Sequence, residues 1–185
     1  MSHTSDRILA EMALHVPLCT LEDPGATLII GCPDRALFEA VIAQHDEAPK
    51  AIFAERFTPT EGDRYDLIID FKYLLRHADE KRALYGSLSD RGIVVVPFGT
   101  DALEAVLADL PDTVRYAMPY GLSTLMPASV DGFLFASRRL HPTADLRIHK
   151  ADMIEESEYY SVDIHEAAFA LPASLYRTLK SHLKI

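Results

Sequence analysis

The stretch Ala26-Thr27-Leu28-Ile29-Ile30-Gly31-Cys32-Pro33-Asp34-Arg35-Ala36 decides the fold class. Its first five residues form a short apolar run, which is typical of a strand whose two faces are both covered in a parallel sheet. A tight turn with glycine and proline follows, and residues 35–45 then carry apolar side chains at helical spacing. A strand, a turn and a helix in this order are the repeating unit of an open α/β sheet.

The same alternation continues on both sides of this unit. A helix is expected over residues 5–16, with Ser5 as its N-cap. Because the last two expected strands have no helix between them, they should pair antiparallel, whereas helical crossovers make the rest of the sheet parallel, with helices on both faces. Further strands are expected at 51–54, 66–69, 92–96, 113–118 and 132–137, and further helices at 77–88 and 101–110.

From residue 143 onward the pattern becomes helical, with pieces expected at 145–154, 163–170 and 172–183. We expect this tail, residues 143–185, to pack on one edge of the sheet. Residues 1–185 would then form a single Rossmann-like domain, since 185 residues are enough to bury one core without disulfides.

The composition argues against several classes of function. A formal charge of −10 and an isoelectric point near 5.2 argue against nucleic-acid binding, which needs a basic surface. Cys19 and Cys32 are too few for a disulfide framework, and neither cysteines nor histidines show the spacing of a metal site, so we expect none. The polar start and the absence of a long apolar run predict a cytoplasmic protein that does not enter a membrane.

A recognisable pattern extends from Glu158 to Pro172, Glu-Tyr-Tyr-Ser-Val-Asp-Ile-His-Glu-Ala-Ala-Phe-Ala-Leu-Pro. It resembles the closing segment of the spermidine synthases, the polyamine aminopropyltransferases, in which these groups recur in this order. A second similarity covers Glu11-Met12 in the first helix and Leu28-Ile29-Ile30-Gly31 in the first strand. The resemblance implies a Rossmann-like fold of the methyltransferase superfamily, in a truncated and divergent member that lacks the family's N-terminal β domain.

The resemblance also implies a reaction, the transfer of an aminopropyl group from decarboxylated S-adenosylmethionine to putrescine. The donor is a co-substrate, so no permanently bound cofactor is expected. Gly31 and Asp34 match the family's glycine-rich run, which places Asp34 against the ammonium of the donor's aminopropyl chain. Asp34 could equally cap the helix that follows it. Glu55 matches the family glutamate that would hold the ribose, although a solvated acid at a strand end remains the alternative.

Asp70 and Tyr120 are the remaining candidates that the resemblance supplies. The family has an acidic loop after the third strand that deprotonates the attacking amine, but Phe71 and Leu74 stand in the acidic places here. Asp70, one residue earlier, is therefore the candidate base, which must come within hydrogen-bond distance of the proton that it removes. Tyr120 matches a family tyrosine and is the candidate contact for the polyamine substrate.

The interval between Glu55 and Tyr65 keeps other functions open, because only nine residues separate them. The family has a further helix, a strand and an adenine-contacting aspartate in this interval. A non-catalytic homologue is the rival hypothesis, a scaffold that binds a nucleoside or polyamine, forms a homo-oligomer or pairs with a partner subunit. A small methyltransferase would share the fold but not the pattern at residues 158–172.

Overall fold

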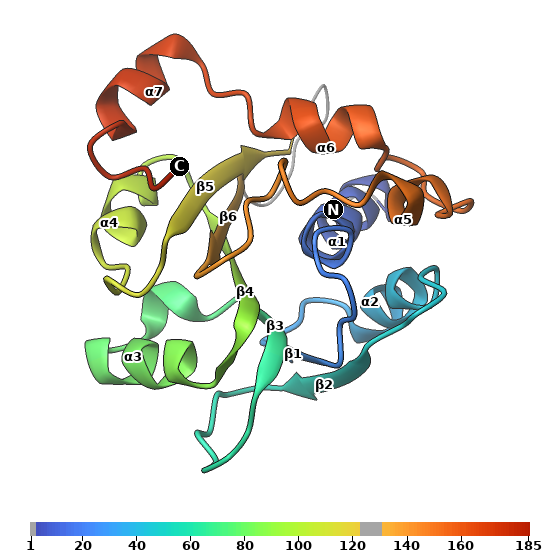
Figure 1. Cartoon of the computed structure of the whole chain (residues 1–185), viewed down its shortest axis with the longest axis horizontal. Helices are drawn as coiled ribbons and strands as arrows, with labels where there is room; N and C mark the ends of the chain where they lie inside the picture. The colour runs from blue at the N-terminus through green and yellow to red at the C-terminus, as the bar shows by residue number, and fades with distance from the viewer. Residues whose placement is uncertain (1–2, 123–130) are drawn as a thin grey trace.

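The computed structural model describes residues 3–122 and 131–185 and shows one six-stranded sheet in the order β2-β1-β3-β4-β6-β5 (Figure 1). The first four strands are parallel, whereas β6 runs antiparallel to β4 and to β5. Both the mostly parallel sheet and the antiparallel final pair are thus confirmed. The strands are β1 (Ala26–Ile30), β2 (Lys50–Ala54), β3 (Tyr65–Asp70), β4 (Leu88–Phe98), β5 (Tyr116–Gly121) and β6 (Gly132–Ser137).

Helices cover both faces of the sheet, as the sequence predicts. Successive residues of β3 point to opposite faces, so Leu67 and Ile69 join the apolar cluster under α1 and α2, and Ile68 joins the cluster under α3 and α4. All three side chains are completely buried. The helices are α1 (His3–Leu18), α2 (Arg35–Ile42), α3 (Ala78–Gly86) and α4 (Leu103–Ala108), and a short 3₁₀ helix, η1 (Tyr73–Leu75), follows β3.

Helix α1 is buried on all sides rather than along a single stripe. It begins at His3, so the prediction of Ser5 as its N-cap is wrong, and Ser5 lies in the first turn. Every side chain over residues 8–20 is buried. A helix that lies on a sheet exposes its outer side unless another segment covers it, and the C-terminal tail provides that cover (Figure 1).

The tail occupies both faces of the sheet and not only one edge. Ala151 in α5 (Ile148–Asp152) and Ala168 in α6 (Val162–Ala168) belong to the cluster around α1, whereas Leu179 in α7 (Ala173–Leu179) belongs to the opposite cluster. After α7 the chain returns to the edge of β5. There Ala117 N–H donates to the Lys184 carbonyl at 2.7 Å. In the described residues, no helix combines the length and the apolar character needed to cross a bilayer.

Candidate functional site

The candidate site lies where β1, β2 and β3 end. The strand register places Ile30 of β1 beside Ala54 of β2 and beside Asp70 of β3. From β1 the chain continues through α2 on one face of the sheet, and from β3 it continues through α3 on the other. Ligands of open α/β sheets bind beyond the carboxyl ends of the strands where connections diverge in this way. The structure therefore brings Gly31, Glu55 and Asp70 to one end of the sheet.

Gly31 makes a turn that few other residues could make. Its φ of 63° lies in the left-handed region, which glycine adopts without strain, and its N–H donates to the Ala54 carbonyl at 2.8 Å. A β-carbon at this position would lie 2.6 Å from Cε of Lys72. The turn thus allows close backbone approach, but the aliphatic part of Lys72 lies over it. Burial raises the pKa of the neighbouring Cys32 thiol to about 11, which makes it a poor nucleophile.

Asp34 caps α2. Its Oδ1 accepts a hydrogen bond from the Leu37 N–H at 3.0 Å, and its backbone is extended, as an N-cap residue requires. The capping alternative is therefore present in the structure. Because the side chain is exposed, a second role at the ammonium of a donor stays a prediction.

Glu55 opens onto a groove beside the Gly31 turn. The groove has a volume of about 620 Å³, which falls within the range of small-molecule sites. Glu55 is exposed at the end of β2, so its carboxylate is accessible to ribose hydroxyls, and this role also stays a prediction. The lining residues are Glu55, Arg56, Lys72, Leu75, Arg76, His77 and Glu80.

Asp70 is completely buried and forms an ion pair with Arg76. Arg76 Nε donates to Oδ2, Arg76 Nη2 donates to Oδ1 at 3.3 Å, and the Lys72 backbone N–H donates to Oδ1 at 2.9 Å. Only 6% of the Arg76 side chain is exposed, so this pair is shielded from water. A carboxylate with three N–H donors can accept a substrate proton only if some of these bonds break. The role of Asp70 as a base stays a prediction, and the structure shows what it would require.

The groove also carries two cations without an ion-pair partner among the described residues. They are the ammonium of Lys72 and the guanidinium of Arg56, both on exposed side chains. The carboxylate of Glu55 lies on the same groove. Opposite charges therefore share this site, and a cationic ligand would have to approach the carboxylate while avoiding Lys72 and Arg56.

Tyr120 lies in the core, away from the groove. Its side chain is completely buried, and its hydroxyl donates to the Met12 carbonyl at 3.2 Å. The ring packs against Phe133 and Phe169, and burial raises its pKa well above the usual value. Contact with a polyamine would require the core to open here, so the structure does not bring Tyr120 together with Gly31, Asp34 and Glu55.

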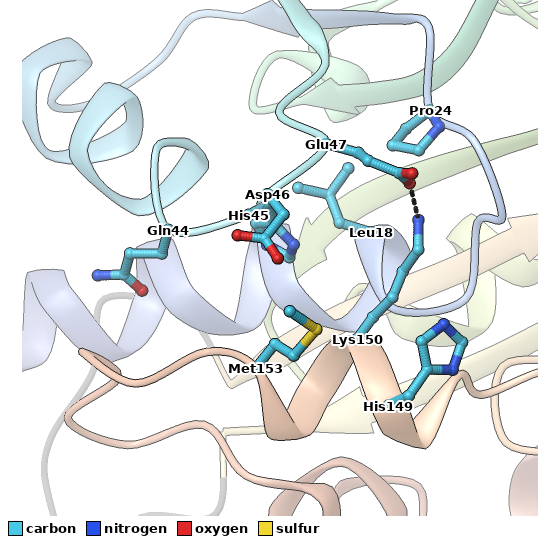
Figure 2. Close-up of a pocket in the computed structure, with 9 residues that line it drawn as sticks. All are labelled: Leu18, Pro24, Gln44, His45, Asp46, Glu47, His149, Lys150 and Met153. Carbon is cyan, nitrogen blue, oxygen red and sulfur yellow. Dashed lines mark hydrogen bonds and ion pairs between the residues drawn. The ribbon is translucent and has the colours of Figure 1, made fainter.

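A smaller pocket lies at the opposite end of the sheet, where α1 and α2 end (Figure 2). Its volume of about 140 Å³ is too small for a nucleoside. Lys150 and Glu47 form an ion pair at 3.0 Å across it. The described residues contain no group of three or more histidine, cysteine or acidic side chains placed to hold a metal ion.

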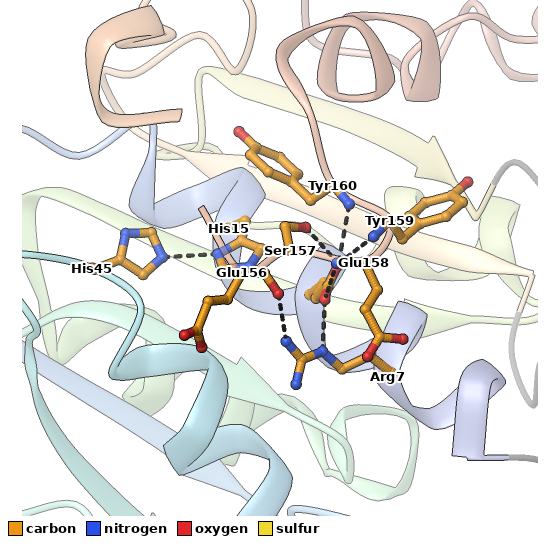
Figure 3. Close-up of polar contacts among 9 residues, drawn as sticks. Arg7, His15, His45, Glu156, Ser157, Glu158, Tyr159 and Tyr160 are labelled. Carbon is orange, nitrogen blue, oxygen red and sulfur yellow. Dashed lines mark hydrogen bonds and ion pairs between the residues drawn. The ribbon is translucent and has the colours of Figure 1, made fainter. Parts of the chain in front are cut away.

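The segment that carries the recognisable sequence pattern is attached to α1 through Glu11. Oε2 of Glu11 accepts bonds from the Ser157 hydroxyl at 2.7 Å and from the N–H groups of Tyr159 and Tyr160 at 2.9 and 3.0 Å. Oε1 accepts from Arg7 Nε at 2.6 Å and from the Glu158 N–H at 3.0 Å (Figure 3). Burial alone would raise the pKa of Glu11, but these hydrogen bonds lower it to about 2. We call this set of contacts the tail lock.

His165, in the same pattern, has a structural role. The ring is completely buried and bridges the Tyr160 hydroxyl at 2.9 Å and the Pro142 carbonyl at 3.0 Å. Burial lowers its pKa to about 4, so the ring is neutral near pH 7. Two further histidines lie nearby, with His15 Nδ1 at 2.9 Å from His45 Nε2. Burial lowers the pKa of each ring, so both are neutral near pH 7.

Comparison with known proteins identifies the family. The polyamine aminopropyltransferase of Helicobacter acinonychis is 30% identical over 136 residues, which cover 71% of this chain. The chain is a divergent member of the polyamine aminopropyltransferase family. No family model matches it. It spans about half the length of the curated relatives that it matches first, 51% of the Helicobacter acinonychis protein.

Two solved structures show that the fold is shared with this family. Spermidine synthase from Thermotoga maritima superposes with a TM-score of 0.72 at 20% identity, covering 97% of this chain and 76% of that one. A spermidine synthase in complex with the transition-state analogue AdoDATO also gives a TM-score of 0.72, at 19% identity, covering 98% of this chain and 77% of that one. These likenesses confirm the Rossmann-like architecture that the sequence predicts.

Two site residues of this aminopropyltransferase-family chain were not anticipated. Asp70 is predictable from its place at the end of the third strand, but Arg76, which neutralises it, and Lys72, which covers Gly31, were not predicted. A signal was available, because two cationic residues, Lys72 and Arg76, follow the third strand. In parallel sheets, residues that directly follow a strand line the ligand end, so their charges indicate the electrostatics of the site.

Proposed function

We infer that this chain binds decarboxylated S-adenosylmethionine in the groove beside β1 and β2, and transfers its aminopropyl group to a diamine such as putrescine. Family membership supports this proposal. The observation that carries it is that Gly31, Asp34 and Glu55 follow the adjacent strands β1 and β2. Glu55 lines a groove of about 620 Å³, as does Lys72, which lies over Gly31. The relatives are named polyamine aminopropyltransferases, and the chain spans 51% of the length of the Helicobacter acinonychis protein.

In this proposal each residue has a separate role. Glu55 accepts hydrogen bonds from the ribose hydroxyls, and Asp34 faces the ammonium of the aminopropyl chain. The amine nitrogen of the acceptor attacks the methylene carbon bonded to the sulfonium sulfur. A C–N bond forms as the C–S bond breaks, the thioether nucleoside leaves with the bonding electron pair, and the amine gives one proton to a base.

Asp70 is the proposed base, on the condition that Arg76 moves away. Rotation of the Arg76 side chain toward the groove that it lines would free Oδ2 of Asp70. Ligand binding would have to favour the arrangement with the pair open. Asp70→Asn keeps the shape of the side chain but cannot accept the proton, so it tests this role directly.

A non-catalytic scaffold is the second candidate, and two observations favour it. The Asp70–Arg76 pair leaves the carboxylate satisfied, and Lys72 lies over the turn that a donor would approach. A protein that binds no donor has no reason to open either contact. The scaffold hypothesis therefore predicts that the donor does not change the unfolding midpoint of the protein.

Thermal unfolding with and without decarboxylated S-adenosylmethionine separates the two candidates. A ligand that binds only the native state raises the unfolding midpoint in a saturable manner. The expected shift should disappear in Asp34→Ala and also in Asp34→Asn, which keeps a capping oxygen but removes the charge. It should grow in Lys72→Ala, which uncovers Gly31 and removes a cation. If wild type and Lys72→Ala both ignore the donor, the transferase proposal is overturned.

Where binding is found, a product assay decides whether transfer follows. The wild-type chain with donor and putrescine should release the thioether nucleoside and form an aminopropylated diamine, detected by mass spectrometry. Asp70→Asn should reduce the turnover by about 100-fold or more if Asp70 is the base, with little change in donor affinity. Donor binding without product in the wild type would overturn the transfer step and leave a chain that only binds the donor.

A further inference from the structure

Strand β2 is an open edge of the sheet. It pairs with β1 on one side, and the sheet order ends with it on the other. The chain between Ala54 and Tyr65 contains no helix and no strand, so nothing in this interval extends the sheet beyond β2. Figure 1 shows β2 at the margin of the molecule, with no labelled element on its far side. Open edges offer backbone N–H and C=O groups to other chains.

The opposite edge, β5, is protected in two ways. Ala117 points its N–H outward and donates it to the Lys184 carbonyl at 2.7 Å, and the Lys184 N–H returns to the Ala117 carbonyl at 3.4 Å. Pro119, at the next outward position, has no N–H. The outward positions Ala117 and Pro119 therefore offer no free N–H to another strand. The contrast with β2 shows that the fold protects one edge and leaves the other available.

The hydrogen-bond pattern shows which groups of β2 are free. The Lys50 N–H donates to the Gly25 carbonyl, and the Ala54 carbonyl accepts from the Gly31 N–H, so both residues direct these groups toward β1. Because backbone groups alternate along a strand, Ile52 also faces β1, while Ala51 and Phe53 direct their N–H and C=O groups outward. Among the described residues, the outward groups of Ala51 and Phe53 have no hydrogen bond to another segment.

We propose that β2 is a dimer interface, at which two copies of this chain pair β2 with β2 antiparallel across a two-fold axis at Ile52. In this register Ala51 of one copy lies opposite Phe53 of the other, and each such pair exchanges two N–H···O bonds. Two symmetric pairs give four bonds, and the two sheets join into one. Ile52 lies opposite its own copy as the non-hydrogen-bonded pair between them.

The side chains at this proposed dimer interface suit a second copy of the chain. Ala51, Ile52 and Phe53 are apolar and half-buried, so pairing would remove apolar surface from water on both faces of the sheet. Lys50, the one charged residue of the strand, stands at its end and outside the central pairs. An interface in which one patch meets an identical patch closes after two copies, which is the commonest form of homo-oligomer.

Ala51→Pro tests the hydrogen bonds of the proposed dimer interface. Proline removes an outward N–H, keeps the ladder to β1 intact and is tolerated on edge strands. Sedimentation velocity should find a dimer for the wild type and at least tenfold weaker association for Ala51→Pro, because two of the four bonds are lost. A wild type that stays monomeric throughout the micromolar range would overturn the proposal, and so would a folded Ala51→Pro that dimerises as well as the wild type.

Cysteine cross-linking keeps the proposal testable if Ala51→Pro does not fold. In the Cys32→Ser background, Ile52→Cys should form an intermolecular disulfide, since Cα atoms of a non-hydrogen-bonded pair lie about 4.5 Å apart, within disulfide reach. Ala51→Cys is the matched control. The residues at position 51 of the two chains would be displaced by two residues along the paired strands, so the distance between their Cα atoms would exceed the roughly 7 Å limit for a disulfide. Equal cross-linking at both positions, or at neither, would contradict this register.

Discussion

The tail lock and the groove are built on opposite principles. Both oxygens of Glu11 in the tail lock are buried and accept at least two hydrogen bonds each. In the groove, Glu55 and Lys72 are exposed and few polar contacts fix them. The sequence pattern that resembles the family therefore lies in the region that maintains the fold, whereas the candidate site departs from the family's pattern at Phe71 and Leu74. Recognising this family identifies the scaffold before it identifies the reaction.

The tail lock also explains why the resemblance appears at two distant places in the sequence. One place contains Glu11 in α1, and the other begins at Glu158, and the structure joins them directly. A buried carboxylate is costly without donors, so the helix and the tail segment constrain each other. No comparable constraint acts on Glu55, because water can satisfy an exposed carboxylate.

Replacement of Glu11 should give the largest effect and would test the tail lock most directly. Glu11→Ala removes the acceptor of five hydrogen bonds and leaves buried N–H groups unpaired. We expect the free energy of unfolding to fall by about 4 kcal/mol, as for a broken buried ion pair. Urea unfolding followed by circular dichroism measures this loss. Glu39→Ala is the control, because its pair with Arg35 is exposed and should contribute about 0.5 kcal/mol.

The same residue predicts the direction of a pH dependence. Its pKa in the folded protein, about 2, lies below the ordinary value of 4.5, so Glu11 stabilises the fold fully above about pH 4.5. This contribution, about 3 kcal/mol, should be lost as the pH falls from 4.5 toward 2. Glu11→Gln should lose less stability over that interval. Equal acid sensitivity of the two proteins would show that the tail lock is weaker than its geometry indicates.

The second-largest effect is expected at Asp70, where the groove meets the core. Asp70→Asn leaves Arg76, whose side chain is 6% exposed, without its anion, and we expect a loss of about 3 kcal/mol in unfolding free energy. Adding Arg76→Met should recover part of this loss, since the double variant buries no unpaired charge. Additive losses in this double-mutant cycle would mean that Asp70 and Arg76 do not stabilise each other.

Much of the fold could be predicted because its signals are local. Short apolar runs such as Leu28–Ile30 are typical of strands covered on both faces in a parallel sheet, and glycine at position 31 suits the left-handed φ of the turn toward α2. The position of the tail could not be predicted in this way. Whether Leu179 joins one apolar cluster or the other depends on the route of the chain around β5, which no local spacing encodes.

The candidate site was predictable in position but not in its electrostatics. Strand ends alone place Gly31, Glu55 and Asp70 together, because parallel strands end at one side of a sheet. The pairing of Asp70 with Arg76 depends on how η1 folds back over β3, and the cover of Gly31 by Lys72 depends on the same turn. Tyr120 was assigned by resemblance alone, and only the packing shows it in the core.

A third, smaller effect is expected at His45, which lies outside the groove, and it concerns the pH dependence of the stability. The pKa of His45 falls to about 4, mainly through burial and also through Lys150, against a weak opposing effect of Asp46. Because the unfolded chain takes up the proton below about pH 6.5, stability is lost as the pH falls from there to about 4. His45→Gln should therefore lose about 2 kcal/mol less than the wild type between pH 7 and pH 5. Unfolding curves at both pH values measure this, and identical slopes would contradict it.

The smallest expected effect concerns Asp34, which caps α2 and is the candidate contact for the ammonium of the donor. Its Oδ1 caps α2 at the Leu37 N–H, so Asp34→Ala should cost about 1 kcal/mol, whereas Asp34→Asn should cost only a few tenths because an amide oxygen can cap equally well. Donor binding should respond in another way, with both variants losing it, since only the charge can attract an ammonium. Thermal midpoints of the three proteins with and without donor separate the two roles. If Asp34→Asn keeps both its stability and its donor response, Asp34 is a helix cap alone, and the groove must recognise its ligand through Glu55.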